Sequence, residues 1–291
     1  MANNIELFKQ YIGSVLDEVY KNASLTAVLD GANELVQQGA NANELLIPKM
    51  SMDGLGDYSR SGGYVQGDVT LEMETVKCNF DRGRMFTVDS MDNIETAGVA
   101  FGRLAGEFIR TKVVPELDAF RFAAYAGLSG ISTTDAAALS TGAAVIAAIA
   151  AAADGMDNDE VPQSERYLFI TPTLLGLVRD LDTTKSKAVL DQFAGVIKVP
   201  QSRFYTAIDQ LDGKTSGEEA GGYTKATGAK DINFMIIHKP AVIQFEKHVV
   251  PKIVTPEQNQ DADAWKFGYR NVSIADGYEN KVKGIYLHKN A

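Results

Sequence analysis

The sequence predicts an α+β protein in which helical and β segments occupy separate blocks of the chain. Residues 69–77, VTLEMETVK, alternate apolar and polar side chains as a half-exposed strand does. Residues 92–127 carry two apolar stripes at helical spacing, and residues 143–153 form an alanine-rich run that favours a helix. The segment 248–289 is again mostly β in character.

The N-terminal residues predict an amphipathic helix that stands apart from the rest of the chain. Apolar side chains recur there at spacings of three and four, at Ile5, Phe8, Ile12, Val15 or Leu16, and Val19. Polar, glycine-containing sequence follows, so we interpret these residues as an arm. The apolar stripe of such an arm has to pack either on the body of its own chain or on a neighbour.

A long two-stranded extension is predicted next. ELLIPKM and VTLEMETVK supply the strands, and five glycines between Gly54 and Gly67 supply turn conformations at the tip. Their spacing matches neither a Walker phosphate loop nor a dinucleotide-binding fingerprint, so we interpret them as turn residues. Because an isolated two-stranded ribbon is only marginally stable in water, we expect this extension to pack against a partner.

The charged stretch that follows, CNFDRGRMFTVDSMDNIET, could be mistaken for a catalytic one. As a strand it places Arg82 and Arg84 on one face, and Asp81 and Asp89 on the other. This segregation assembles no acid–base pair. It suits a strand whose two faces meet different surfaces.

A long helix is predicted for residues 92–127. Asp92 begins it, with Glu95 three residues later in a variant of the capping box. As one helix it would reach ~54 Å at 1.5 Å per residue, with a bend at Pro115. Such a length exceeds what a compact domain needs, and it indicates a spine.

The second half of the chain predicts a compact α/β region. YLFI, VIKVP and RFYTAI predict strands, and TPTLLGLVRDL predicts a helix. DINFMIIHKPAVIQFEK predicts a strand followed by a helix that starts at Pro240, and residues 212–231 predict a solvent-exposed loop. Towards the C-terminus, Trp265, Phe267 and Tyr269 share one face of a predicted strand.

Composition excludes several classes of function. The net charge of −10 argues against general attraction to nucleic acid or to an anionic membrane. Cys78 is the only cysteine and the three histidines lack ligand spacing, so no metal site, cofactor or internal disulfide is expected. No secretory signal is present, and the longest apolar run, residues 143–153, is about half of what crosses a bilayer. We therefore expect a soluble protein made in the cytoplasm.

An enzymatic function is not supported by the sequence. Three serines, Ser140, Ser164 and Ser202, lack the context of a nucleophile elbow. The acidic cluster at residues 154–160 lacks the glycine and the distal glutamate of an EF-hand loop, and is interpreted as a solvated loop between elements. We expect no catalytic residues.

The order of elements, together with DRGRMFTVDSMDNIET and IVTPEQNQDADAWKFGYR, resembles the major capsid proteins of tailed bacteriophages. The resemblance covers essentially the entire chain and implies the Hong Kong 97-type shell fold. It implies an N-arm at residues 1–42 and an extended loop at 43–89. Residues 90–135 would form the peripheral domain with the spine helix, residues 136–245 the axial domain, and residues 246–291 the strands returning to the peripheral domain.

The resemblance also implies function and partners. Copies of the chain would assemble through pentamers and hexamers into an icosahedral shell around packaged double-stranded DNA, confined without sequence-specific recognition. Scaffold, portal and head-completion proteins are possible further partners, and no membrane is involved. The chain would be a virion component assembled in the cytoplasm of a bacterial host. A scaffolding segment, present in some relatives before the arm, would here be absent, encoded separately or already removed.

Four residues are candidates for contacts between subunits. Arg82 and Arg84 lie where the extended loop returns to the spine, a region that overlaps neighbouring subunits in this fold. The alternative is a solvated strand face, since surface ion pairs contribute only about 0–1 kcal/mol each. Arg60 at the loop tip and Trp265 in the second diagnostic segment complete the set.

The sequence departs from the family in one feature. Some members join a loop lysine to an asparagine of another subunit by an isopeptide bond. Here the tip, residues 53–67, has no lysine, and Arg60 is a poor nucleophile. Lys49 and Lys77 lie on the flanks, so we predict no covalent cross-linking.

The alternative within the same fold is an encapsulin, whose shell encloses protein cargo instead of a genome. Fold alone does not separate the two, because the difference depends on what the inner surface binds. The EQNQDADAWKFGYR segment favours the phage protein.

Overall fold

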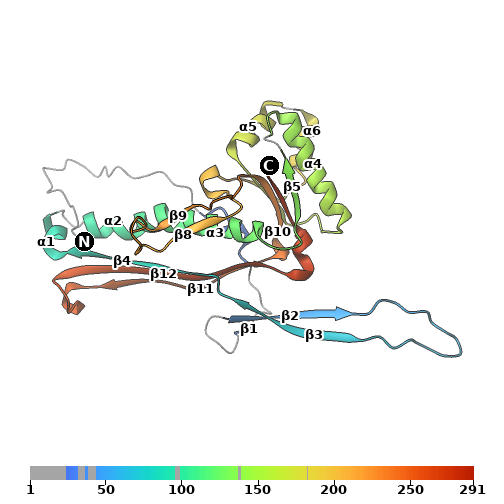
Figure 1. Cartoon of the computed structure of the whole chain (residues 1–291), viewed down its shortest axis with the longest axis horizontal. Coiled ribbons are helices and arrows are strands. Elements are labelled where there is room, and N and C mark those ends of the chain that lie inside the picture. The colour runs from blue at the N-terminus through green and yellow to red at the C-terminus, as the bar shows by residue number, and fades with distance from the viewer. Residues whose placement is uncertain (1–23, 32–36, 39–43, 96–98, 137–138, 182) are drawn as a thin grey trace.

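The computed structural model describes residues 24–31, 37–38, 44–95, 99–136, 139–181 and 183–291. The arm helix predicted around residues 5–19 lies outside these ranges. Within them the chain is a mixture of helices and sheets, as predicted. Figure 1 shows a compact lobe around β10, an elongated layered region of helix on sheet, and a hairpin that projects away from both.

The compact lobe is built on a five-stranded sheet of order β5-β13-β10-β6-β7. The strands are β5 (Ser132–Ala136), β6 (Arg166–Ile170), β7 (Gly195–Lys198), β10 (Ile232–His238) and β13 (Ile285–Asn290). All seven residues of β10 are buried, since this strand lies in the middle of the sheet and is covered on both faces. The apolar run INFMIIH is typical of such a strand.

Helices and a second core cover the two faces of this sheet. On one face lie α4 (Gly142–Asn158), α5 (Pro172–Leu181) and α6 (Thr184–Leu190). Their apolar side chains pack with alternate sheet residues such as Leu168 and Ile236. On the other face, Phe122 and Tyr125 of a further helix pack against the remaining sheet residues.

The elongated region is a three-stranded antiparallel sheet of order β11-β12-β4, with helices along one face. Its strands are β4 (Phe80–Asp89), β11 (Val242–Val254) and β12 (Ala264–Gly277). Along β4, burial alternates as the sequence predicts. Ring contacts attach the helices to the sheet, with centroid distances of 4.8 Å for Phe86–Phe108 and 5.0 Å for Phe80–Phe120.

The predicted spine is a series of helical segments. They are α1 (Ser90–Glu95), α2 (Val99–Phe108), a π-helical turn (Ile109–Val113) and α3 (Val114–Ala126). Asp92 therefore lies in the first turn, two residues inside the helix start. A bend was predicted at Pro115, and the structure has a π-helical turn at residues 109–113 directly before α3, with Pro115 in the first turn of α3. A proline there lacks a backbone N–H that the first turn does not need.

The extension is formed by β2 (Glu44–Met52) and β3 (Val69–Lys77), with the short β1 (Gln37–Gln38) beside β2. The two long strands pair antiparallel from Glu44↔Lys77 to Met52↔Val69, as the alternating pattern predicts. Figure 1 shows this hairpin and its tip projecting beyond the body. The following strand, β4, lies within the predicted loop range but pairs with β12.

Four local predictions from the sequence are wrong, and one of them, the acidic cluster 154–160, is described with the surfaces below. RFYTAI is not a strand, because Gln201–Arg203 form a 3-10 turn and the next strand begins only at Ile208. The segment after Pro240 is not a helix, because it forms a short 3-10 turn (Lys239–Ala241) and then the 13-residue strand β11. Its pairing along β12 outweighs the local start signal of the proline. The glycine-rich segment 212–231 is not all loop, since β9 (Gly222–Lys225) pairs with β8 (Ile208–Leu211).

Further 3-10 turns connect these elements, and the last strand joins the five-stranded sheet of the lobe. The turns are Ala27–Leu29, Gln201–Arg203, Pro256–Gln258 and Glu279–Gly284. Strand β13 follows the last of them and lies between β5 and β10. Its residues fall within the range 246–291, for which the resemblance implies strands returning to the peripheral domain.

A buried polar network fixes the segment 24–30 to the body. The Asp118 carboxylate of α3 is fully buried and accepts hydrogen bonds from Ser24, the backbone N–H groups of Leu25 and Thr26, and the Thr26 hydroxyl. It also pairs with the Arg203 guanidinium at 2.9 Å. These hydrogen bonds and the ion pair compensate the charge of the buried carboxylate, which thereby connects three segments that are distant in the sequence.

Candidate subunit-interaction surfaces

The β2–β3 hairpin has one apolar face that is exposed among the described residues. The register pairs Met50 with Leu71 and Met52 with Val69, and Met73 lies on the same face as Leu71. These five side chains are between 51% and 67% exposed. An ordinary surface has single exposed apolar residues, whereas a contiguous set indicates an interaction site.

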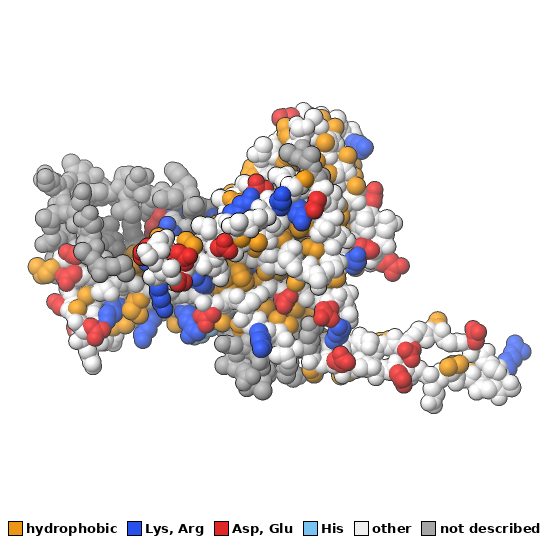
Figure 2. All heavy atoms as spheres, in the orientation of Figure 1, with side chains coloured by type: hydrophobic (Ala, Val, Ile, Leu, Met, Phe, Trp, Pro, Cys, Tyr) orange, Lys and Arg blue, Asp and Glu red, His pale blue; other side chains and the backbone are white. Residues whose placement is uncertain are grey.

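The opposite face of the hairpin is polar, and the charged residues at its tip are mostly acidic. Lys49, Ser51, Thr70 and Glu72 alternate with the apolar set. The tip carries Asp53, Asp57 and Asp68, with Arg60 as its single basic residue. Figure 2 shows several acidic side chains along the extension and blue, basic atoms at its far end. The hairpin is therefore an amphipathic two-stranded ribbon.

The tip is ordered by local contacts. A bridge pairs Ser59 with Gly63, and the Tyr58 and Tyr64 rings lie 4.9 Å apart. Tyr64 is 88% exposed and Leu55 fully so. Arg60 is exposed at this turn, and its contact with a neighbouring subunit stays a prediction.

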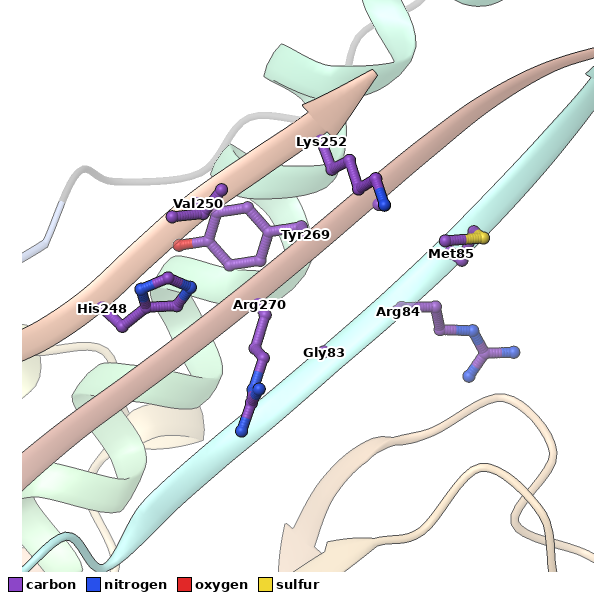
Figure 3. A pocket seen from close by; sticks show the side chains of 9 residues that line it. Gly83, Arg84, Met85, His248, Val250, Lys252, Tyr269 and Arg270 are labelled. Carbon is purple, nitrogen blue, oxygen red and sulfur yellow. The ribbon is translucent and has the colours of Figure 1, made fainter. Parts of the chain in front are cut away.

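A shallow hollow of about 430 Å³ lies on the three-stranded sheet. Figure 3 shows the side chains around it on β11, β12 and β4. Glycines lack the side chains that would fill it. The lining residues are Gly83, Arg84, Met85, His248, Val250, Lys252, Gly268, Tyr269 and Arg270. Arg270 is held there by both carboxylate oxygens of Asp81, at 2.8 Å and 2.6 Å, and these bonds lower the pKa of Asp81.

Arg82 and Arg84 both point toward the β8–β9 hairpin of their own chain. The Arg82 Nε donates to Glu116 at 2.8 Å, and its Nη2 donates to the carbonyls of Leu211 at 2.8 Å and Gly222 at 3.1 Å. Arg84 donates to the carbonyls of Glu219 at 2.8 Å and Ala220 at 3.2 Å. Figure 3 shows the Arg84 side chain extending from β4 toward that hairpin.

These within-chain contacts are a feature that the sequence did not predict. The two arginines share a face of β4, as predicted, but the alternation of the strand could not reveal a partner about 130 residues later. Their contact with a neighbouring copy stays a prediction. Burial raises the pKa of Glu116, and the charge and hydrogen bond of Arg82 oppose this effect.

Trp265 lies on β12, opposite Val88 of β4, and is half-buried. Phe267 and Tyr269, the other two aromatic residues of the predicted face, are buried. The Tyr269 ring lies 6.2 Å from the Phe108 ring, so this face packs on the helices. Trp265 is thus partly a core residue, and its role between subunits stays a prediction.

The acidic cluster 154–160 is not a loop, because α4 extends through Asn158. Asp157 pairs with the buried Arg166 at 2.6 Å, and Asp159 lies 3.9 Å from Lys283. Among the residues that the structure describes, no group of three or more His, Cys, Asp or Glu side chains could hold a metal ion. In the same ranges, no helix is long and apolar enough to cross a membrane.

Comparisons with known proteins identify the fold. A protein of Mycobacterium phage Che8 superposes with a TM-score of 0.64 at 14% identity, over 99% of this chain and 98% of that one. The capsid structure of Cyanophage P-SCSP1u gives a TM-score of 0.61 at 12% identity, over 98% of this chain and 93% of that one. A virus-like particle from Pyrococcus furiosus gives 0.55 at 10% identity, over 91% and 97%.

These similarities confirm the resemblance to phage capsid proteins at the level of the fold. They cover nearly the whole chain, so the fold includes the projecting hairpin as well as the two sheets. No protein-family model and no curated protein sequence matches the chain.

Proposed function

We propose that this chain is a major capsid protein that self-assembles through pentamers and hexamers into an icosahedral shell enclosing double-stranded DNA. The single observation that carries the proposal is the apolar face of the β2–β3 hairpin, on a fold shared with phage capsid proteins. The residues that the structure describes leave this face exposed. Contacts with identical copies would cover it, and rotational closure of such contacts produces rings.

Burial of this face would contribute part of the free energy of shell assembly. Full burial of one such side chain contributes about 1.5–3 kcal/mol, so covering the exposed half of each contributes about 1 kcal/mol. Five side chains then supply on the order of 5 kcal/mol per hairpin before the cost of ordering. Each subunit would make several contacts, and multivalency makes a closed shell more persistent than any one of them.

The remaining parts of the proposal follow the resemblance. The N-arm, extended loop, peripheral domain and axial domain keep the boundaries given above. Scaffold, portal and head-completion proteins would be partners during assembly in a bacterial host, and the mature chain would be part of the virion. Arg60 and Trp265 are proposed contacts between subunits, while the role of Arg82 and Arg84 is argued separately below. The shell has no catalytic function in this proposal.

The test is assembly of purified protein, followed by electron microscopy. Leu71→Asp places a charge on the apolar face, and Thr70→Asp places the same charge on the polar face one residue away. We expect Thr70→Asp to form shells or rings like the wild type, and Leu71→Asp to lose at least nine tenths of them. Both variants should keep the wild-type melting temperature within about 2 °C, because both side chains are exposed.

Three results would contradict the proposal. A Leu71→Asp protein that forms normal shells removes the role of the apolar face. Equal loss in both variants shows a general effect of charge on the hairpin. Absence of shells and rings from the wild type, with and without co-expressed scaffold, contradicts the shell function itself.

An encapsulin-type shell is the second candidate, and the likeness to the Pyrococcus furiosus virus-like particle favours keeping it. The two functions differ in content. Shells isolated from the natural source would contain double-stranded DNA in the first case and a protein cargo in the second. The absorbance ratio at 260 and 280 nm and a denaturing gel of the same fraction distinguish them.

A further inference from the structure

We propose that Arg82 and Arg84 form an intramolecular clamp that holds the β8–β9 hairpin against the three-stranded sheet. The clamp would fix the position of that hairpin within the folded chain, before any contact with another copy. Arg82 and Arg84 would then be positioning residues inside one subunit, which differs from the contact between subunits expected from the sequence. This inference is independent of the proposed shell function.

The β8–β9 hairpin needs such support because it has no core of its own. No residue between 205 and 230 is fully buried. The two strands pair over four residues each, and a two-stranded ribbon of that length is unstable alone in water. The hairpin must therefore be held by contacts with the rest of the chain.

Arg82 supplies contacts where the two paired strands enter the hairpin loop. One Nη2 group bonds the carbonyls of Leu211 and Gly222, which are paired residues at the ends of β8 and β9. The Nε of the same guanidinium is fixed by Glu116 of α3. The arginine thus joins β4, α3 and both hairpin strands, and the planar fork of a guanidinium is suited to several fixed acceptors.

Arg84 supplies contacts at the hairpin loop, whose glycines leave space for it. Its guanidinium bonds the carbonyls of Glu219 and Ala220. A Cβ added to Gly221 would lie 2.8 Å from the Arg84 Nη1, and one added to Gly213 would lie 3.0 Å away. Both glycines also have positive φ angles, of 64° and 71°. The loop is therefore shaped around the arginine.

The hairpin loop is also organised by its own carboxylates. Asp212 accepts the backbone N–H groups of Lys214 and Thr215 and the Thr215 hydroxyl, and these bonds lower the pKa of Asp212 to about 2. Backbone N–H groups likewise lower the pKa of Glu219. The backbone N–H groups of the loop thus bond its own carboxylates. The backbone carbonyls of Glu219 and Ala220 accept hydrogen bonds from Arg84.

Amide hydrogen exchange of the full-length protein tests the clamp. We expect Arg84→Ala to accelerate exchange of the β9 amides at least tenfold, and the Arg82→Ala, Arg84→Ala double variant to accelerate it further. Exchange in β13 should not change. Arg270→Ala is the matched control, since that arginine lies on the other face of the same sheet and bonds Asp81. Wild-type protection of β9 in Arg84→Ala would overturn the clamp.

A glycine substitution tests the same contact from the hairpin. Gly221→Ala and Gly217→Ala both put a side chain at positive φ, but a Cβ at Gly217 would meet nothing within 4 Å. We expect Gly221→Ala to accelerate β9 exchange several-fold more than Gly217→Ala does. That difference should disappear in an Arg84→Ala background, where the obstructing guanidinium is gone. A difference that persists there would overturn the role of Arg84.

The outcome can be separated from general unfolding. Arg84→Ala leaves Glu116 with its partner Arg82, so it creates no unpaired buried carboxylate, and it carries the test alone if Arg82→Ala fails to fold. Arg84→Lys retains the positive charge but loses the planar guanidinium group with its several donors. Its β9 exchange rate is expected between those of wild type and Arg84→Ala. A wild-type rate for Arg84→Lys with a fast rate for Arg84→Ala would show that charge alone suffices and would overturn the geometric part of the proposal.

Discussion

The five-stranded sheet and the β2–β3 hairpin use similar strand-forming residues with opposite results. In β10 every side chain is buried, because sheet neighbours and two layers of helices and loops surround it. In β2 and β3 the apolar side chains from Met50 to Met73 have no cover within the described chain and are more than half exposed. The comparison shows that the first region is stabilised by contacts within its own chain. The second has an apolar face that is available for contact with another molecule.

The contrast also separates stability from assembly. Changes in the lobe should lower the free energy of unfolding and reduce assembly only as a consequence. Changes on the apolar face of the hairpin should reduce assembly while the melting temperature stays constant, as the Leu71→Asp and Thr70→Asp pair tests. The predictions below extend this comparison, in order of decreasing effect.

The largest effect is expected from Phe122→Ala in α3. The Phe122 ring is fully buried, 5.2 Å from Phe169 and 4.9 Å from Phe204, and its removal leaves a cavity in the core. We expect a loss of about 3–5 kcal/mol in the free energy of unfolding, measured by urea denaturation. Leu71→Ala on the hairpin is the control and should change that value by less than about 0.5 kcal/mol. Equal losses would refute the distinction between the two regions.

Asp118→Ala should destabilise the lobe by about 3 kcal/mol, because it removes the buried carboxylate that pairs with the Arg203 guanidinium. It also removes the acceptor for Ser24 and Thr26. Limited proteolysis should then cut between residues 24 and 31 faster than in the wild type. Asp81→Ala, which removes an exposed ion pair with Arg270, is expected to cost less than about 1 kcal/mol. An unchanged cleavage rate in Asp118→Ala would contradict the anchoring role.

Two buried histidines predict a smaller, pH-dependent effect confined to the lobe. Burial lowers the pKa of His238 and of His288 below the ordinary value of 6.5. The unfolded chain therefore binds more protons below pH 6.5, and stability falls as the pH is lowered through that value. Urea denaturation at pH 7.5 and pH 5.5 should show this loss, and His238→Asn should reduce it. A protein equally stable at both values would contradict the prediction.

The last prediction concerns the hairpin, for which we expect no covalent cross-linking between subunits. Its tip has no lysine, so contacts through the hairpin should remain non-covalent. Assembled particles that are boiled and reduced should give one monomer band on a denaturing gel. A ladder of higher bands would show cross-linking and would redirect attention to Lys49 and Lys77.

The sequence predicted those elements whose signal is local. Alternation in VTLEMETVK and in residues 80–88 predicted β3 and β4 with the correct faces, and the apolar run of β10 predicted its strand. The apolar face of the hairpin was equally visible, because it follows from the same alternation. The sequence predicted a bend at Pro115, and it did not predict the π-helical turn at residues 109–113 just before it.

Elements that depend on distant partners were not predictable in this way. β11 begins after a proline that favours a helix start, and only its pairing along β12 makes it a strand. β9 lies in a glycine-rich segment with a loop composition, and it exists because β8 pairs with it. The partners of Arg82 and Arg84 are backbone carbonyls, which leave no mark on the sequence. The glycines at 213 and 221 were the one available signal, but they are equally typical of any turn.

The position of β13 has a consequence for how the protein is made. This strand lies between β5 and β10, yet its residues 285–290 are synthesised about 50 residues after β10 itself. While the chain is still on the ribosome, one edge of β10 therefore has no neighbour, and an open apolar edge promotes pairing between nascent chains. The five-stranded sheet of the lobe can be completed only after translation has passed residue 290. Incompletely translated chains would thus remain unfolded targets for proteases and chaperones.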